Sequence, residues 1–171
     1  GADRAVLLRG TPSVDGLGTA EALARFLRDR SPDLVLFGKQ AIDDDNMQVP
    51  AMVATLLDWP CVTVVVGLER GDRTWRARRE VEGGHEVVEF ALPAVVSVQK
   101  GLNEPRYPSL KGIMAAKTKP LEELDAGAVR SRCEIVRLEP PPERTGGVIV
   151  GAGPDAVPEL VRRLREEAHV L

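Results

Sequence analysis

Short aliphatic runs alternate with amphipathic stretches along the first part of the chain. The runs Ala5–Leu8, Leu34–Phe37 and Cys61–Leu68 have the length and composition of buried strands. Between them, about Thr19–Asp29 and about Met47–Leu57 place apolar residues at helical spacing. A strand–helix–strand rhythm brings successive strands into one mostly parallel sheet, so it predicts a doubly wound α/β fold. Leu34–Phe37 is apolar throughout and is expected in the middle of that sheet.

The spacing of apolar residues changes after the third predicted strand. Turn signals at Arg70-Gly71-Asp72 and Glu82-Gly83-Gly84 bracket Thr74–Val81, and another strand pattern follows at Val87–Ala91. These features indicate an antiparallel hairpin excursion. The chain is expected to return to the sheet at Ala94–Val98.

Past Lys119, proline and glycine become frequent. One strand is predicted there, at Cys133–Leu138, and a terminal helix at about Asp155–Glu167. The helix carries one apolar stripe, formed by Leu160, Val161 and Leu164. A helix at the end of a proline-rich arm is expected to pack on another molecule. We therefore divide the chain into an α/β domain, residues 1–119, and an arm with a helix, residues 120–171, that packs on a partner subunit.

Composition excludes several classes of function. A net charge of −3 provides no basic field for nucleic acid. No apolar run approaches the ~20 residues of a membrane span, and the first residues lack the pattern of a secretory signal. Cys61 and Cys133 are far apart in sequence and are expected as buried thiols in a reducing compartment. Neither histidine has a neighbouring nucleophile, which excludes a hydrolytic triad.

A polar loop follows the second predicted strand and leads into the second helix. It comprises Gly38, Lys39, Gln40, Ala41, Ile42, Asp43, Asp44, Asp45, Asn46, Met47, Gln48 and Val49. In an open α/β sheet, ligands bind at the carboxyl ends of strands, where backbone N–H groups and the helix dipole attract an anion. Gly38 permits a close backbone approach, and Asp45 or Asn46 is expected to cap the helix. The loop predicts a phosphate site if its amides, and not its carboxylates, face the ligand.

Two other interpretations of the three consecutive aspartates remain open. Asp43, Asp44 and Asp45 would form a magnesium site in a nucleotide-cleaving enzyme, although consecutive residues cannot all point at one ion. Alternatively, they form a solvated acidic turn that only caps the following helix.

Residues 102–114, LNEPRYPSLKGIM, combine stiff backbone with an apolar turn. Pro105 and Pro108 push the residues before them toward extended geometry, and Ser109 is expected to cap a short helix. The apolar face of that helix is formed by Leu110, Ile113 and Met114, and the cations around it are Lys100, Arg106, Lys111, Lys117 and Lys119. This is the chemistry of a docking surface for an acidic partner. The same pattern also fits a short core helix between two strands.

Three segments resemble the beta subunit of electron-transferring flavoprotein. LNEPRYPSLKGIM is similar to the segment with which that subunit docks onto partner dehydrogenases. The resemblance implies a docking loop at residues 102–117, with Leu110 inserted into the partner and contacts from Tyr107, Ile113 and Met114. GKQAIDDD, followed by Gln48, resembles the loop that binds a structural AMP. In REVEGG, Glu80 matches a glutamate that contacts the flavin domain, whereas from pattern alone it is a charged residue on an exposed hairpin.

The resemblance implies an electron carrier and not an enzyme. The fold would be adenine-nucleotide alpha-hydrolase-like, of Rossmann type, and this chain would match the C-terminal two-thirds of a family member. An alpha subunit would hold most of the FAD and receive the arm, in a heterodimer. Electrons would come from acyl-CoA dehydrogenases of fatty acid oxidation, or similar flavoenzymes, and pass to a quinone oxidoreductase. The compartment would be the cytoplasm in a bacterium or the mitochondrial matrix in a eukaryote.

Some positions depart from the family's pattern. Val49-Pro50 follows Gln48 where many members have Thr-Gly, and Ala115 takes the place of a modified lysine. Valine after that glutamine is also typical of electron-bifurcating members, which carry a second FAD in the AMP position. The triple aspartate favours AMP. A bifurcating type, an adenine-nucleotide-hydrolysing α/β protein and a stand-alone AMP-sensing module remain as alternatives.

Overall fold

The computed structural model describes residues 1–10, 15–143 and 146–171. Residues 11–14, part of the Gly/Pro/Ser stretch before the first predicted helix, lie outside this description. The chain forms two compact units, Gly1–Ile135 and Val136–Leu171. The first unit runs past Lys119 because β7 (Leu121–Asp125) pairs in parallel with β1 (Ala5–Arg9). The boundary between the two compact units follows Ile135.

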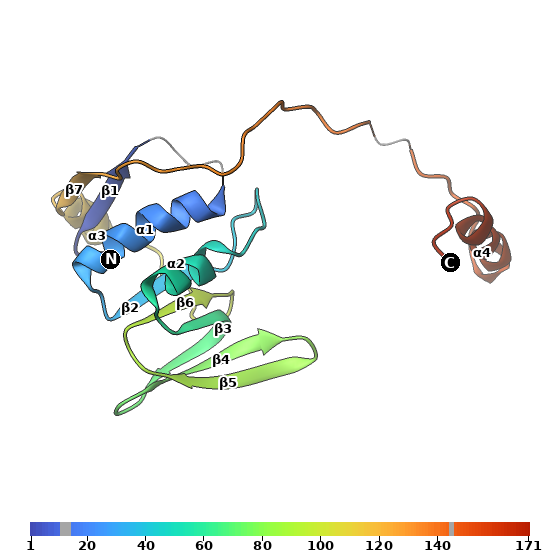
Figure 1. The fold of residues 1–171 in the computed structure, drawn as a ribbon. Coiled ribbons are helices and arrows are strands. Elements are labelled where there is room, and N and C mark those ends of the chain that lie inside the picture. The colour runs from blue at the N-terminus through green and yellow to red at the C-terminus, as the bar shows by residue number, and fades with distance from the viewer. Residues whose placement is uncertain (11–14, 144–145) are drawn as a thin grey trace. The chain divides into compact units, whose positions relative to one another are not determined.

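The first unit contains a five-stranded mixed sheet (Figure 1). Its order is β2 (Leu34–Gly38), β6 (Ala94–Val98), β3 (Cys61–Arg70), β4 (Trp75–Val81) and β5 (Gly84–Phe90). β2 and β3 run parallel to β6 on either side of it, and β3, β4 and β5 are antiparallel neighbours. This arrangement confirms the α/β fold with an antiparallel hairpin excursion.

The central parallel strand is β6, and the expectation that Leu34–Phe37 lies in the middle of the sheet is wrong. In the described residues β2 pairs with β6 alone and forms an edge of the five-stranded sheet. Its Leu36 side chain is 54% exposed. Ala94–Ser97 of β6 are all buried, because both faces of this strand are covered. An apolar run identifies a strand, but its place in the sheet depends on neighbours far away in sequence.

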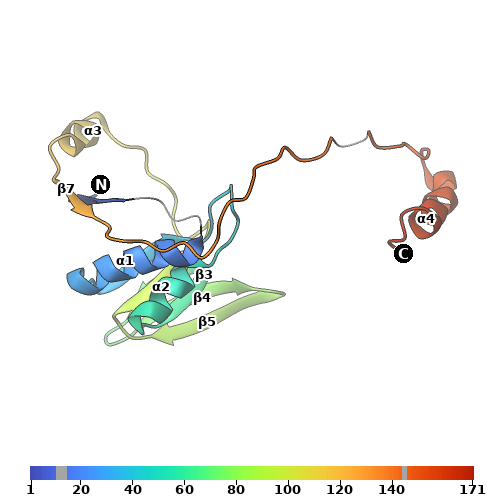
Figure 2. The same cartoon turned by 45° about the horizontal axis from the view of Figure 1, so that its top comes forward.

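Two helices cover one face of the sheet. α1 (Gly16–Arg30) and α2 (Val49–Leu57) join Val95 of β6 in one apolar cluster, as the position of both helices in Figure 2 illustrates. The buried members of this cluster are Ala20, Val53, Ala54 and Val95. Both helices were predicted, although α1 begins earlier than expected. None of the helices in the described residues is long and apolar enough to cross a bilayer.

A bulge in β3 lets the hairpin contribute to the core on the other face. The pairing register shifts between Val62 and Val65, and Val64 has a φ of 61°, which is rare for a β-branched residue. The Val64 N–H donates to the buried Ser97 hydroxyl at 3.1 Å. Arg79 donates to the Thr63 carbonyl, also at 3.1 Å. A bulge bends its strand and increases its twist. On that face one cluster contains the buried residues Val62, Val65, Ala77, Phe90, Ala94 and Val96.

The acidic stretch Leu121–Asp125 forms a strand that its sequence did not predict, while the predicted strand Cys133–Leu138 is absent. β7 is stabilised by its ladder with β1 and by the Arg9–Glu123 ion pair at 2.6 Å. Ile135, by contrast, has no strand partner and is exposed. A segment forms a strand only where its backbone N–H and C=O groups can pair with a neighbouring strand.

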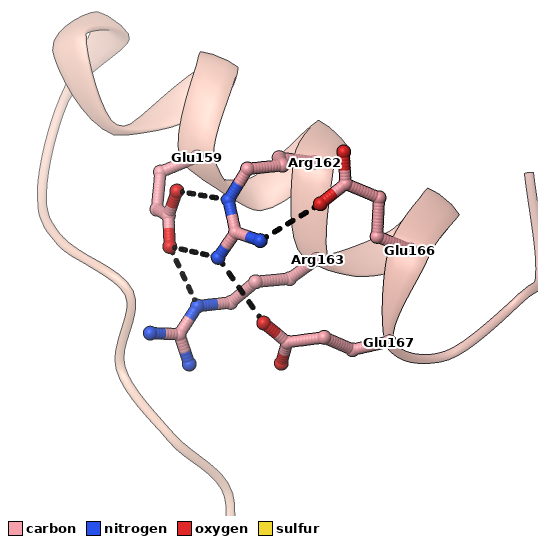
Figure 3. Close-up of polar contacts among 5 residues, drawn as sticks. All are labelled: Glu159, Arg162, Arg163, Glu166 and Glu167. Carbon is pink, nitrogen blue, oxygen red and sulfur yellow. Dashed lines mark hydrogen bonds and ion pairs between the residues drawn. The ribbon is translucent and has the colours of Figure 1, made fainter.

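The second unit contains a 3-10 turn η1 (Pro154–Ala156) and the helix α4 (Val157–Glu166), which confirms the predicted terminal helix. Figure 3 shows Arg162 at the centre of a charge network on α4. Its guanidinium contacts the carboxylates of Glu159, Glu166 and Glu167 at 2.8, 2.9 and 3.1 Å. Hydrogen bonds from Arg162 and Arg163 lower the pKa of Glu159 to about 2. Pairs three and four residues apart support a helix that has no buried residue of its own.

Candidate functional site

A cavity of about 500 Å³ opens where β2 ends and where α1 and α2 begin. In α/β folds this edge of the sheet is the usual place for ligands. The lining residues are Asp15, Gly16, Thr19, Phe37, Gly38, Lys39, Gln40, Ala41, Asp44, Asn46, Met47, Gln48, Val49, Pro50 and Cys133. Among these described residues Lys39 is the single cationic side chain.

The structure brings most of the predicted loop to this cavity. Nine of its residues line the cavity: Gly38, Lys39, Gln40, Ala41, Asp44, Asn46, Met47, Gln48 and Val49. Ile42, Asp43 and Asp45 do not line it. Ile42 is 97% exposed. Asp43 accepts a hydrogen bond from the Asp44 N–H at 2.9 Å, and Asp45 accepts one from the Gln40 side chain at 2.7 Å. These two carboxylates stabilise the loop itself.

The three aspartates do not form a metal centre in this structure. Within the described residues, no group of three or more His, Cys, Asp or Glu side chains is placed to hold a metal ion. The magnesium interpretation therefore has no geometric support.

The N-terminus of α2 is left without a side-chain cap. Gln48 occupies the N-cap position and makes no capping hydrogen bond with its side chain. The expectation that Asp45 or Asn46 caps this helix is therefore wrong. Positive φ angles at Asp45 and Met47 turn the loop so that the helix starts at Val49 instead. Pro50 lacks an N–H, but the remaining first-turn amides are available to an anion.

The start of α1 is the part of the site that the sequence did not predict. Asp15 caps this helix, and its carboxylate accepts a hydrogen bond from the Gly18 N–H at 2.7 Å. Gly16 has no side chain, which lets the start of α1 pack closely against the Gln48 side chain. A Cβ at this position would lie only 3.2 Å from the Gln48 side-chain nitrogen. An aspartate before a helical pattern is a capping signal. It was missed because the glycines around it indicated a loop.

One residue after β7, Cys133, also lines the cavity, and the residues before it bond to Asp15. The Ser131 hydroxyl and the Arg132 N–H both donate to the second carboxylate oxygen of Asp15. Cys133 and Cys61 are both free and exposed, so the expectation of buried thiols is wrong.

Hydrogen bonding to Asp15 predicts a pH dependence of stability. Bonds from the Gly18 N–H and the Arg132 N–H lower the pKa of Asp15 to about 2, against ~3.9 in an unfolded chain. A lowered folded-state pKa means that the stabilisation is complete above the unfolded-state value and is lost as the pH falls from ~4 toward ~2. We expect the difference in free energy of unfolding between the wild type and Asp15→Asn to be constant near neutral pH and to shrink below about pH 4. Urea unfolding at several pH values measures this difference. A difference that did not change with pH would contradict the assignment.

The segment 102–114 forms the predicted capped helix. α3 spans Leu110–Ala116, and the Ser109 hydroxyl accepts a hydrogen bond from the Gly112 N–H at 3.1 Å. Figure 2 shows α3 on a long excursion between β6 and β7.

No residue of α3 is buried, so it is not a core helix of this chain. The side chains of Tyr107 and Leu110 are 98% and 77% exposed, and Ile113 and Met114 are exposed beside them. We call these four residues the α3 surface. Glu80 lies elsewhere, exposed on β4 opposite His85 of β5, and does not line the cavity.

The family model and the similar proteins all point to the same family. Residues 1–129 match the electron transfer flavoprotein domain. An electron transfer flavoprotein subunit beta of Syntrophomonas wolfei is 40% identical over 155 residues, which are 91% of this chain and 62% of the relative. The Bacillus subtilis subunit beta is 40% identical over all of this chain and 71% of its own length. The Homo sapiens subunit beta is 41% identical over 99% of this chain and 68% of its own length. The chain thus spans less than two thirds of the first of these relatives.

Proposed function

The chain belongs to the electron transfer flavoprotein domain family, and from this premise we propose that it is the beta subunit of a heterodimeric electron carrier. The names of the relatives support an electron-transfer role and imply an alpha partner. FAD, held mainly by the alpha subunit, supplies the redox chemistry when bound. This chain binds a structural nucleotide, docks partners and needs no catalytic residue of its own.

The observation that carries the proposal is the cavity between the starts of α1 and α2. Its volume of about 500 Å³ falls within the ~300–1,000 Å³ typical of small-molecule sites. The uncapped start of α2 and the cationic Lys39 suit a phosphate group. Phe37, Met47 and Val49 supply apolar surface for an adenine base. These residues fit AMP, which has one charged end and one aromatic end.

AMP is favoured over a second FAD at this position. FAD contains the same adenosine phosphate together with a further phosphate and a flavin ring, and so requires additional space. The opposing observation is Val49, which is also found in members with a second FAD. An electron-bifurcating carrier is therefore the second candidate function.

The α3 surface is the proposed docking site for acyl-CoA dehydrogenases or similar flavoenzymes. An exposed apolar cluster of Tyr107, Leu110, Ile113 and Met114 supports this role. The neighbouring cations are suited to steer an acidic partner. Electrons leave the carrier to a quinone oxidoreductase. Glu80, exposed on β4, is the proposed contact to the flavin domain.

The second compact unit is proposed to pack on the alpha subunit. Leu160 of α4 is exposed, and Val161 and Leu164 beside it are only partly buried, so this stripe is available to another chain. The proposed compartment is the cytoplasm for a bacterial source and the mitochondrial matrix for a eukaryotic one.

Assembly tests this proposal. The full-length protein, co-expressed with its alpha partner, is expected to appear as a flavin-containing heterodimer in native mass spectrometry. Deletion of residues 136–171 is expected to weaken the heterodimer, because it removes α4. A full-length protein that stays monomeric and binds AMP alone would contradict the proposal and favour an AMP-sensing module.

A further inference from the structure

One residue of the cavity lining, Cys133, comes from the distant segment Ser131–Cys133. We call this segment the arm latch. We propose that Asp15 is a positioning residue for the cavity: it holds the arm latch in place, so that nucleotide binding and attachment of the arm latch stabilise each other. This inference rests on the proposed nucleotide-binding function and adds a coupling between the site and the arm.

The two carboxylate oxygens of Asp15 accept hydrogen bonds from two different parts of the chain. Oδ1 accepts the Gly18 N–H at 2.7 Å and caps α1. Oδ2 accepts the Ser131 hydroxyl at 3.0 Å and the Arg132 N–H. The same side chain therefore fixes the start of the helix and the arm latch at the edge of the cavity.

Further contacts along α1 hold the arm in a defined path. The Arg25 guanidinium donates to the Ala126 and Ala128 carbonyls at 2.9 and 3.2 Å. The Arg132 guanidinium pairs with Glu21 at 2.9 Å. The arm thus follows α1 from Arg25 through Glu21 to Asp15, and Asp15 is the contact that reaches the cavity.

The position of Cys133 at the cavity explains how the arm latch would act on nucleotide binding. Asp15 and Cys133 both line it, together with the loop that ends at Gln48 and Val49. If the arm latch detached, this part of the lining would open to solvent and the bound nucleotide would lose buried contacts. By thermodynamic linkage, a nucleotide that binds the closed lining must strengthen the attachment of the arm latch by the same factor.

Asp15→Asn separates the two roles of this side chain. Asparagine is as good an N-cap as aspartate, so the bond to Gly18 is retained. Its amide nitrogen cannot accept from Ser131 or from the Arg132 N–H, and the arm latch is released. Asp3→Asn is the matched control, because it makes the same charge change at an exposed ion pair with Lys119 outside the cavity.

Charge alone predicts the opposite effect on nucleotide binding. Removal of a negative charge beside the cavity should strengthen the binding of an anion. Release of the arm latch should weaken it. The sign of the change therefore distinguishes a positioning role from simple electrostatics.

The test measures AMP affinity and arm exchange in the full-length heterodimer after its nucleotide has been removed. We expect Asp15→Asn to weaken AMP binding about tenfold, equivalent to ~1.4 kcal/mol, and Asp3→Asn to leave it unchanged. In the wild type, AMP should slow hydrogen exchange at residues 131–133, and this effect should be absent in Asp15→Asn. The melting temperature of the nucleotide-free protein should fall at neutral pH by the contribution of the bonds to the arm latch, while the α1 cap is kept.

Two negative outcomes are distinct. If the wild type binds AMP and Asp15→Asn binds it equally well or more tightly, the positioning role is overturned and the proposed function stands. If the wild type takes up no AMP, the proposed nucleotide function is overturned, and the positioning role with it.

Discussion

Leu110→Ala is expected to weaken reduction by a partner dehydrogenase by about ten- to hundredfold in apparent affinity. Truncation of an interface leucine that fills a partner's pocket costs ~1–3 kcal/mol. Leu110 is 77% exposed and no residue of α3 is buried, so its apolar surface is free to meet another protein. Steady-state reduction of the heterodimer at increasing carrier concentration measures this affinity.

Controls separate a docking role from a structural one. Leu121→Ala removes the same side chain from β7, where it is 59% exposed and lies outside the α3 surface, and is expected to leave docking unchanged. Chemical reduction of Leu110→Ala by dithionite should match the wild type, since this route needs no partner. A large fall in melting temperature with loss of cofactor would instead identify Leu110 as a core residue.

Phe90→Ala is expected to destabilise the fold by ~3–5 kcal/mol, the usual cost of deleting a buried aromatic ring. Phe90 is 6% exposed at the end of β5 and belongs to the buried cluster that joins the hairpin to β3 and β6. Loss of its ring leaves a cavity between the hairpin and β6, which a rigid sheet fills only in part. Urea unfolding of the full-length protein measures the change.

Val87→Ala on the same strand is the comparison, because Val87 is exposed and should change stability by less than ~0.5 kcal/mol. If both variants lost less than ~1 kcal/mol, the hairpin would not be part of the core.

Local patterns predicted most of the helices and strands. Alternating aliphatic and amphipathic segments identified β1, α1, β2, α2 and β3, and glycine turns identified the β4–β5 hairpin. Local patterns did not predict which of the parallel strands lies between the other two, because β6 owes its burial to neighbours from other parts of the chain. They also missed β7, whose acidic sequence becomes a strand only through its ladder with β1.

In the candidate site, too, local sequence predicted the continuous loop but not the contacts between distant residues. The loop at residues 38–49 was predicted because it is continuous in sequence and lies between a strand and a helix. Asp15, Ser131 and Cys133 were not predicted, since their contacts join positions more than a hundred residues apart. The exposure of Leu110 was likewise undecided by pattern, because an apolar helical turn fits a core and a docking surface equally well.

The nucleotide content of the purified heterodimer shows whether the cavity holds AMP. The full-length protein is denatured, and the released nucleotides are separated by chromatography and counted against protein. We expect one AMP and one FAD per heterodimer, with the AMP held in the cavity between α1 and α2. Recovery of two FAD molecules and no AMP would contradict this expectation and identify an electron-bifurcating carrier.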